Sequence, residues 1–324
     1  MTRLRMPAGA PGARILGIGS AQPERVVSNE ELSRRVQTSD EWIRRRVGIA
    51  NRRIADKDQS LVDMAVEAGG KAIADAGLAP SDLDTVVVAT CTMPTAIPHA
   101  ASQVAERIGI KAPGAFDVNA ACAGFCYGLA AASDMVRAGS AGNVLVIGAE
   151  KLSDWLDWDD RSTCVIFADG AGAAVVGPAD EPRIGPVVWG SAGDIVEVIG
   201  TTPAGHIYQE GQSVFRWATS RITPTALAAI DKAGLAPSDV DVLIPHQANL
   251  RIIESIARQL RAAGARGDLI VADDIVESGN TSSASIPLAL DHMRAAGTVR
   301  SGDVLLFVGF GAGLTYAGQI VICP

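Results

Sequence analysis

Apolar and polar positions follow the same order at two places in the chain, around a nine-residue segment that occurs twice. The segment reads AGLAPSDLD at 76–84 and AGLAPSDVD at 233–241, 157 residues apart, with eight of nine positions identical. A duplicated unit explains this match better than convergence of two helix–turn–strand connections. Apolar spacing predicts a helix before each copy and a buried strand after it: helices at 62–76 and 223–233, strands at 85–90 and 242–245.

A second shared pattern lies further along each repeat. ADGAGAAVVG at 168–177 and GFGAGLTYAG at 309–318 each place a GAG-centred turn before apolar positions that alternate as in a strand. We therefore predict an α/β protein built from two similar units in one body, 1–180 and 181–324. The join is expected in the proline-rich polar segment 178–186.

Composition and charge narrow the classes of function. Hydrophobic residues make up 48% and charged residues 20% of the chain, as in an average soluble globular protein. The formal net charge of −8 argues against general binding to nucleic acid or to an anionic membrane. No apolar run approaches the roughly 18 residues of a membrane helix. Residues 1–12 also lack the apolar region of a signal peptide.

The cysteines indicate a reducing compartment. Five cysteines at irregular spacing in a large chain do not form a disulfide framework, so we predict a cytoplasmic protein. Their spacing to histidines does not resemble a metal site, and the GxGxxG fingerprint of dinucleotide binding is absent from the sequence. We therefore expect neither a metal nor a cofactor.

Cys122 is a candidate nucleophile because it lies between a predicted strand and a predicted helix. The strand ends near 116–119, and the small residues of 128–132 favour a helix that starts just after the cysteine. A helix N-terminus stabilises a thiolate through its dipole and free N–H groups, so we predict a lowered pKa for this thiol. The alternative is a buried structural cysteine, the role that we assign to Cys126.

His246 and Asn280 are two further candidates. His246 follows the second predicted buried strand directly, and residues just past the C-terminal end of a strand line the active sites of open α/β folds. Asn280 precedes the apolar helical stretch 286–293. A core histidine and a helix-capping asparagine are the structural alternatives. The repeat distance of 157 residues places Cys122 opposite Gly279, so we expect both helix starts to face a common centre.

A glycine-rich turn at 309–313 offers backbone N–H groups without large side chains. Such a turn can supply an oxyanion-hole donor for acyl transfer. Glycine-rich turns have many other uses, so the turn supports a site only together with Cys122, His246 and Asn280.

Six segments, in this order, resemble the β-ketoacyl-acyl-carrier-protein (ACP) synthase III family, the initiating condensing enzymes of type II fatty acid synthesis, and relatives that prime polyketide synthesis. The resemblance spans nearly the whole chain and implies the thiolase fold, a duplicated αβαβα layered architecture. The segments are SDEWIRRRVGI (39–49), FDVNAACAGF (116–125), DRSTCVIFADGAGAAVVG (160–177), PHQANLRII (245–253), SGNTSSASIPLAL (278–290) and GFGAGLTYAGQ (309–319).

The resemblance implies a decarboxylative condensation. Cys122 accepts an acyl group from acyl-CoA. His246 and Asn280 then stabilise the enolate that forms as malonyl-ACP loses CO2, and the enolate attacks the acyl group on the cysteine. The backbone N–H groups of Cys122 and Ala312 form the oxyanion hole.

The resemblance also implies binding roles around this centre, in a homodimer. The residues expected to contact CoA and its pantetheine arm are Trp42, Arg46, Arg161, Gly211 and Asn249. Those expected to bind the acidic carrier protein are Arg216, Arg251 and Arg258. The acyl pocket is expected to be bordered by Phe167 and Phe310 and closed across the dimer interface by Ile97.

Three departures from the family bear on specificity. Ala312 stands where many members have glycine, and Ile97 stands where an acetyl-selective form has phenylalanine, which favours branched or longer acyl groups. The segment 191–211 is shorter than usual. Two alternatives compete with condensation: an acyltransferase forming esters or amides without decarboxylation, and an inactive partner subunit. An enolate-stabilising Asn280 argues against the first, and the complete set of Cys122, His246 and Asn280 argues against the second.

Overall fold

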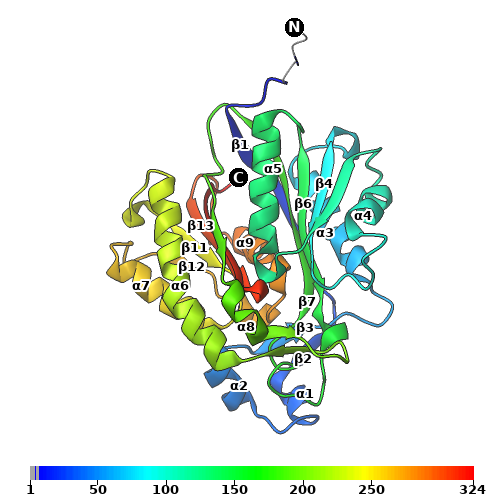
Figure 1. The fold of residues 1–324 in the computed structure, drawn as a ribbon, viewed down its shortest axis with the longest axis vertical. Coiled ribbons are helices and arrows are strands. Elements are labelled where there is room, and N and C mark those ends of the chain that lie inside the picture. Colours follow the sequence, from blue (N-terminus) through cyan, green and yellow to red (C-terminus); the bar gives the residue numbers. More distant parts are fainter. Residues whose placement is uncertain (1–3, 5–6) are drawn as a thin grey trace.

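Two five-stranded sheets with the same strand order form the framework of the protein (Figure 1). The computed structural model describes residue 4 and residues 7–324. In each sheet, three neighbouring strands are parallel and two more are added antiparallel. The first sheet has the order β1 (Gly12–Ala21), β7 (Asp169–Ala179), β6 (Val144–Lys151), β4 (Thr85–Ala89), β5 (Gly114–Val118). The second has the order β8 (Val188–Ser191), β14 (Thr315–Ile322), β13 (Val304–Gly311), β11 (Val242–Pro245), β12 (Ile270–Val271).

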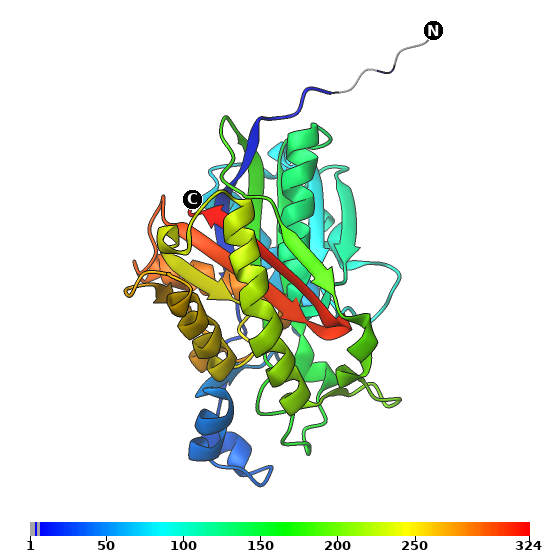
Figure 2. The same ribbon diagram turned by 60° about the vertical axis from the view of Figure 1, so that its left-hand side comes forward.

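Helices form three layers around and between the sheets. One core cluster joins Leu129 of α5 and Leu290 of α9 to Val146 of the first sheet and Phe307 of the second, so α5 and α9 lie between the sheets. Two further clusters cover the outer faces, under α3 and α4 on one side and α6 and α7 on the other (Figures 1 and 2). The predicted αβαβα layering is therefore confirmed. These helices are α3 (Leu61–Asp75), α4 (Ala100–Ile108), α5 (Gly124–Ala138), α6 (Gly211–Lys232), α7 (Leu250–Ala262) and α9 (Ser285–Ala295).

The repeated segment forms the same connection in both sheets. Gly77 (φ +67°) and Gly234 (φ +75°) end the preceding helices in the left-handed conformation that glycine adopts at little cost. In both copies the backbone N–H of the next residue donates a hydrogen bond to a carbonyl of the helix. Leu78 donates to Ile73 and Leu235 donates to Ile230, both at 3.1 Å. The predicted strand 242–245 is confirmed, and β4 ends one residue before its predicted end.

Helix α6 is the largest difference from the predicted elements. It begins at Gly211, not at 223, and it contains Pro224. The first three turns carry polar and aromatic residues without a clear apolar stripe, and proline normally interrupts a helix because it lacks an N–H. Packing of Ala218 and Ile222 into the core overrides these local signals.

Short elements and the loops between them extend beyond the sheets at the lower end of Figure 1. In the described part of the chain, no helix is both long and apolar enough to cross a membrane. The short elements are β2 (Val26–Ser28), α1 (Asn29–Ser33), α2 (Asp40–Val47), β3 (Asn51–Arg53), β9 (Ile199–Thr201), β10 (Ile207–Gln209) and α8 (Ile275–Ser278).

Candidate active site

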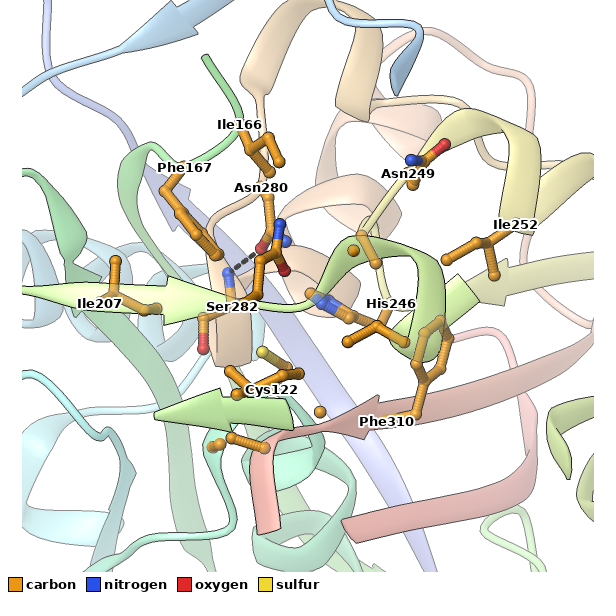
Figure 3. Close-up of a pocket in the computed structure, with 18 of the residues that line it drawn as sticks. Cys122, Ile166, Phe167, Ile207, His246, Asn249, Ile252, Asn280, Ser282 and Phe310 are labelled. Carbon is orange, nitrogen blue, oxygen red and sulfur yellow. Dashed lines mark hydrogen bonds between the residues drawn. The ribbon is translucent and has the colours of Figure 1, made fainter. Parts of the chain in front are cut away.

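A cavity of about 1050 Å³ brings together residues that belong to both sheets and to the short elements. Cys122 enters it just before α5, His246 just after β11 and Asn280 ahead of α9. Figure 3 shows the three side chains directed into the same region of the cavity. The three residues singled out from the sequence therefore share one site.

Cys122 lies in a sharp turn between β5 and α5, as predicted. The preceding residue, Ala121, has a left-handed backbone (φ +45°), which is uncommon for a residue with a β-carbon. The side-chain Oδ1 of Asn119 accepts a hydrogen bond from the Ala121 N–H at 3.2 Å and stabilises this turn. A single 3-10 turn, Ala121–Ala123, then leads into the helix. The turn projects the thiol into the cavity at the start of α5.

The pKa of the Cys122 thiol is raised, whereas the sequence led us to predict that it would be lowered. Burial raises its pKa to about 11. The Ser282 hydroxyl lowers the pKa, the charge of Glu150 raises it, and the backbone N–H groups of Cys122 and Ala312 lower it. Desolvation of the thiolate therefore exceeds the stabilisation by the helix start, and the thiol form dominates at neutral pH.

The second helix start repeats the geometry of the first, with a different register from the one predicted. Ser282 has φ +50°, as Ala121 has φ +45°, and α9 starts 161 residues after α5. Cys122 therefore corresponds to Ser283, and the predicted match to Gly279 is wrong. Insertions between the nine-residue segment and the helix shift the register from 157 to 161.

Asn280 is held by its backbone and by its side chain. Its N–H donates to the Ile166 carbonyl and its own carbonyl accepts from the Ala168 N–H, both at 2.9 Å. Its Oδ1 accepts a hydrogen bond from the Ser282 N–H at 2.9 Å (Figure 3). Asn280 is thus the counterpart of Asn119, and its amide Nδ2 remains as the donor end of the side chain.

His246 is a buried, neutral imidazole. Burial lowers its pKa to about 3, and Phe310 packs edge-on against the ring with 5.3 Å between centroids. Nδ1 lies 2.7 Å from Oγ of Ser285, which also accepts the Gln247 N–H at 3.3 Å. In the tautomer that carries the imidazole proton on Nε2, Nδ1 accepts a hydrogen bond from the Ser285 hydroxyl. In that tautomer Nε2–H is a hydrogen-bond donor.

The glycine-rich turn lies directly against Cys122. A β-carbon at position 311 would lie 2.7 Å from Cβ and 2.9 Å from Sγ of the cysteine, so only glycine fits there. Gly313 has φ +119°, which also favours glycine. The N–H of Ala312 acts on the Cys122 sulfur together with the cysteine's own N–H. Two backbone donors therefore converge at the thiol, as an oxyanion hole requires.

Glu150 is a buried carboxylate near this centre that the sequence predictions missed. It is fully buried at the end of β6, and its charge acts on both Cys91 and Cys122. An acidic residue in the apolar strand VLVIGAEK was the available signal, because a charged side chain is rarely buried without partners.

Comparison with known proteins decides the family. The profile of 3-oxoacyl-[acyl-carrier-protein] synthase III matches residues 116–193, and the profile of its C-terminal region matches residues 230–323. β-Ketoacyl-ACP synthase III 4 of Streptomyces coelicolor is 51% identical over 319 residues, which cover 97% of this chain and 99% of that protein. The chain belongs to the β-ketoacyl-ACP synthase III family. A mycobacterial β-ketoacyl-ACP synthase III from Mycobacterium avium is 46% identical, with 100% of this chain and 99% of the relative covered.

Solved structures of synthase III proteins have the same fold. The priming β-ketosynthase of the R1128 polyketide biosynthetic pathway matches with a TM-score of 0.95 and 41% identity, covering 100% of this chain and 99% of its own. The 3-oxoacyl-ACP synthase III of Aquifex aeolicus VF5 matches with a TM-score of 0.91 and 39% identity, covering 96% and 100%. This synthase III therefore has the predicted thiolase fold. It is a condensing enzyme and acyltransferase of fatty acid or polyketide biosynthesis.

The rim of the synthase III cavity carries aromatic and basic side chains. The guanidinium carbons of Arg46 and Arg161 lie 5.4 and 5.2 Å from the centre of the Trp42 ring. Asn249 caps α7 and donates its Nδ2–H to the Arg46 carbonyl at 3.2 Å. Gly211, the first residue of α6, completes the predicted CoA-contacting set on this rim.

The remaining predicted residues divide between the cavity and the surface. Phe167 and Phe310 are buried in the cavity wall, whereas Ile97 is 88% exposed and outside the lining of its own cavity. The arginines predicted to bind the carrier protein are all exposed on α6 and α7; two of the three also line the cavity (Arg216 and Arg251), and the third does not (Arg258).

Proposed function

We propose that this synthase III transfers an acyl group from acyl-CoA to Cys122 and then condenses it with malonyl-ACP. The observation that carries the proposal is the convergence of the Cys122 thiol, the two backbone donors beside it, His246 Nε2–H and the Asn280 amide on one cavity. In the first half-reaction the sulfur of Cys122 attacks the acyl thioester. The bond to Cys122 forms, the bond to the CoA sulfur breaks, and CoA leaves with the thiol proton.

In the second half-reaction, malonyl-ACP replaces CoA in the cavity. His246 and Asn280 donate hydrogen bonds to the malonyl thioester oxygen and stabilise the enolate as CO2 leaves. The enolate carbon attacks the acyl carbonyl on Cys122, whose oxyanion is held by the N–H groups of Cys122 and Ala312. Collapse of this intermediate breaks the bond to sulfur and releases 3-ketoacyl-ACP, and the Cys122 thiolate then takes a proton from water to regenerate the thiol. A neutral His246 suits this role, because it donates a hydrogen bond without losing a proton.

The side chains at the rim of the cavity are suited to bind both substrates. We assign CoA to Trp42, Arg46 and Arg161, since aromatic and guanidinium faces stack on adenine and cations pair with phosphate. The pantetheine arm is assigned to Gly211 and Asn249. The acidic carrier protein is assigned to the exposed arginines of α6 and α7, which oppose the overall charge of −8: Arg216, Arg251 and Arg258.

A homodimer would complete the acyl pocket. Phe167 and Phe310 form the inner wall, and the exposed Ile97 is proposed to close the pocket of the partner subunit. We also propose a cytoplasmic enzyme whose two halves meet at 180/181, within the connection from β7 to β8. The R1128 relative primes polyketide synthesis, and a roomy pocket behind an isoleucine suits starters longer than acetyl.

The reaction can be tested with a panel of acyl-CoAs followed by malonyl-ACP. Intact-mass measurement is expected to detect an acyl adduct on the wild type and on Cys126→Ala, whose thiol is buried against Gly309, but not on Cys122→Ala. Addition of malonyl-ACP should release the adduct as 3-ketoacyl-ACP with one CO2. Release of an ester or amide without CO2 would favour the competing acyltransferase instead.

A further inference from the structure

The carboxylate of Glu150 is bound by the loop that follows β4. The backbone N–H groups of Cys91 and Thr92 each donate to Oε2 at 3.1 Å. The hydroxyls of Thr90 and Thr92 donate to the same oxygen at 3.1 and 2.6 Å. The Thr92 hydroxyl accepts the Lys151 N–H at 2.9 Å, so its own proton is free for Glu150. Four donors therefore favour the charged carboxylate, although burial raises the pKa of Glu150.

The other oxygen of Glu150 faces the loop that carries Asn280. Oε1 lies 3.1 Å from Oγ of Ser282 and 2.9 Å from Oγ of Ser283. Ser283 also lies 2.8 Å from the Ala89 carbonyl, which takes its single proton in competition with Glu150. Ser282 is therefore the principal hydroxyl donor to Oε1.

Ser282 stands between the carboxylate and the nucleophile. Ser282 and Cys122 both line the cavity (Figure 3), and a hydrogen bond from this hydroxyl to the sulfur would lower the pKa of the thiol. A hydroxyl has only one proton to donate. A hydrogen bond from Ser282 to Glu150 therefore withholds this proton from the sulfur.

We propose that Glu150 is a positioning residue that restrains the nucleophile: its carboxylate holds the Ser282 hydroxyl proton away from Cys122 in the empty enzyme. The inference rests on the proposed function only in taking Cys122 as the nucleophile. A thiol is oxidised far more slowly than a thiolate, so this restraint limits damage to the empty site.

The other ionisable groups around this cluster do not offset the charge of Glu150. The Cys91 thiol lies 3.5 Å from Oε1, and its pKa is raised well above the ordinary value by burial and by Glu150. His246, in the same cavity, is neutral. Lys151 turns away, with Nζ 3.2 Å from the Asp56 carbonyl and 3.5 Å from Asp154.

The pH dependence of Cys122 alkylation tests this inference. Glu150→Gln keeps the size of the side chain, with its oxygen toward the loop after β4 and its NH2 toward the serines, but removes the charge. Ser282 then accepts from the glutamine and is free to donate to the sulfur. We expect the midpoint of the iodoacetamide rate to move to lower pH, with labelling about tenfold faster at a fixed pH below both midpoints.

A matched control is available in a second buried carboxylate. Asp169 is fully buried and accepts hydrogen bonds from Ala55 and Ser153 N–H at 2.8 and 2.9 Å, away from the cavity lining. Asp169→Asn should keep the wild-type midpoint, even where it lowers stability. An unchanged midpoint in Glu150→Gln would overturn the inference.

A second variant covers the case in which Glu150→Gln does not fold. Because Glu150 already holds the Ser282 proton, Ser282→Ala is expected to leave the midpoint close to the wild-type value. A clear rise of the midpoint in this variant would show that the hydroxyl donates to the sulfur in the wild type, and would overturn the inference. Alkylation needs neither acyl-CoA nor the carrier protein, so the result is independent of whether the proposed condensation is correct.

Discussion

Gly311 lies directly against Cys122, and there is no room for a side chain between the two residues. A β-carbon at 311 would lie 2.9 Å from the Cys122 sulfur and 2.7 Å from its Cβ. Gly311→Ala is therefore expected to displace the thiol and to reduce acylation by about a hundredfold or more, since a 1 Å misplacement costs this much. Gly267→Ala is the control, because among the described residues no atom beyond Gly267 and its chain neighbours lies within 4 Å of the added methyl group. Single-turnover acylation measures both, and equal rates would contradict the contact.

The proposed separation of roles predicts different defects for two residues of the site. Cys122→Ala is expected to abolish acylation. Asn280→Ala is expected to acylate normally and to lose condensation by about 10²–10³-fold, the usual effect of removing one donor to developing charge. Stepwise addition of acyl-CoA and malonyl-ACP separates the steps. A parallel loss of both steps in Asn280→Ala would instead indicate a structural role for the asparagine in holding the loop.

Trp42 and Trp158 allow a matched test of the CoA site. Each ring has an arginine guanidinium near it, Arg161 at 5.2 Å from Trp42 and Arg35 at 5.3 Å from Trp158, but only Trp42 lines the cavity. Trp42→Ala is expected to raise the KM for acyl-CoA about tenfold with a smaller effect on kcat, because stacking on adenine contributes to binding. Trp158→Ala should leave the KM for acyl-CoA unchanged. Similar KM values in the two variants would argue against adenine binding at Trp42.

The lowered pKa of His246 predicts how the free energy of unfolding depends on pH. Its pKa is lowered from 6.5 to about 3 in the folded protein, so the unfolded chain binds a proton more readily than the folded one. The stabilisation is complete above pH 6.5 and is lost as the pH falls toward 3, by up to about 1.4 kcal/mol per pH unit. His246→Asn should remove this contribution, so its free energy of unfolding falls less steeply between pH 6 and pH 4. Denaturant unfolding measures the slope, and parallel slopes would refute a buried neutral imidazole.

The fold was largely predictable because its two sheets share local signals. The nine-residue segment fixes a helix end, a turn and a strand in both copies, and α3 and β11 lie within one residue of their predictions. The start of α6 was not predictable, because Ala218 and Ile222 contact residues that are distant in the sequence. The register of 161 between the helix starts likewise depends on loop lengths that local patterns do not reveal.

The site was predictable in its residue types but not in its electrostatics. Cys122, His246 and Asn280 each follow or precede a recognisable helix or strand. The sequence therefore allowed the prediction that their side chains meet in one site. The pKa of Cys122 depends on burial by both sheets and on Glu150 and Ser282, which are distant from it in the chain. Ser285 was likewise missed, since its contact with His246 exists only after α9 packs below β11.

The contacts between the two halves of the chain at the site have a further consequence. The thiol turn before α5 rests against Gly311 at the end of β13, and the asparagine turn before α9 rests against Glu150 at the end of β6. Each repeat thus positions the reactive residue of the other repeat. A fragment that contains one repeat would lack the contacts made by the other, so neither half of the chain carries a complete reactive site by itself.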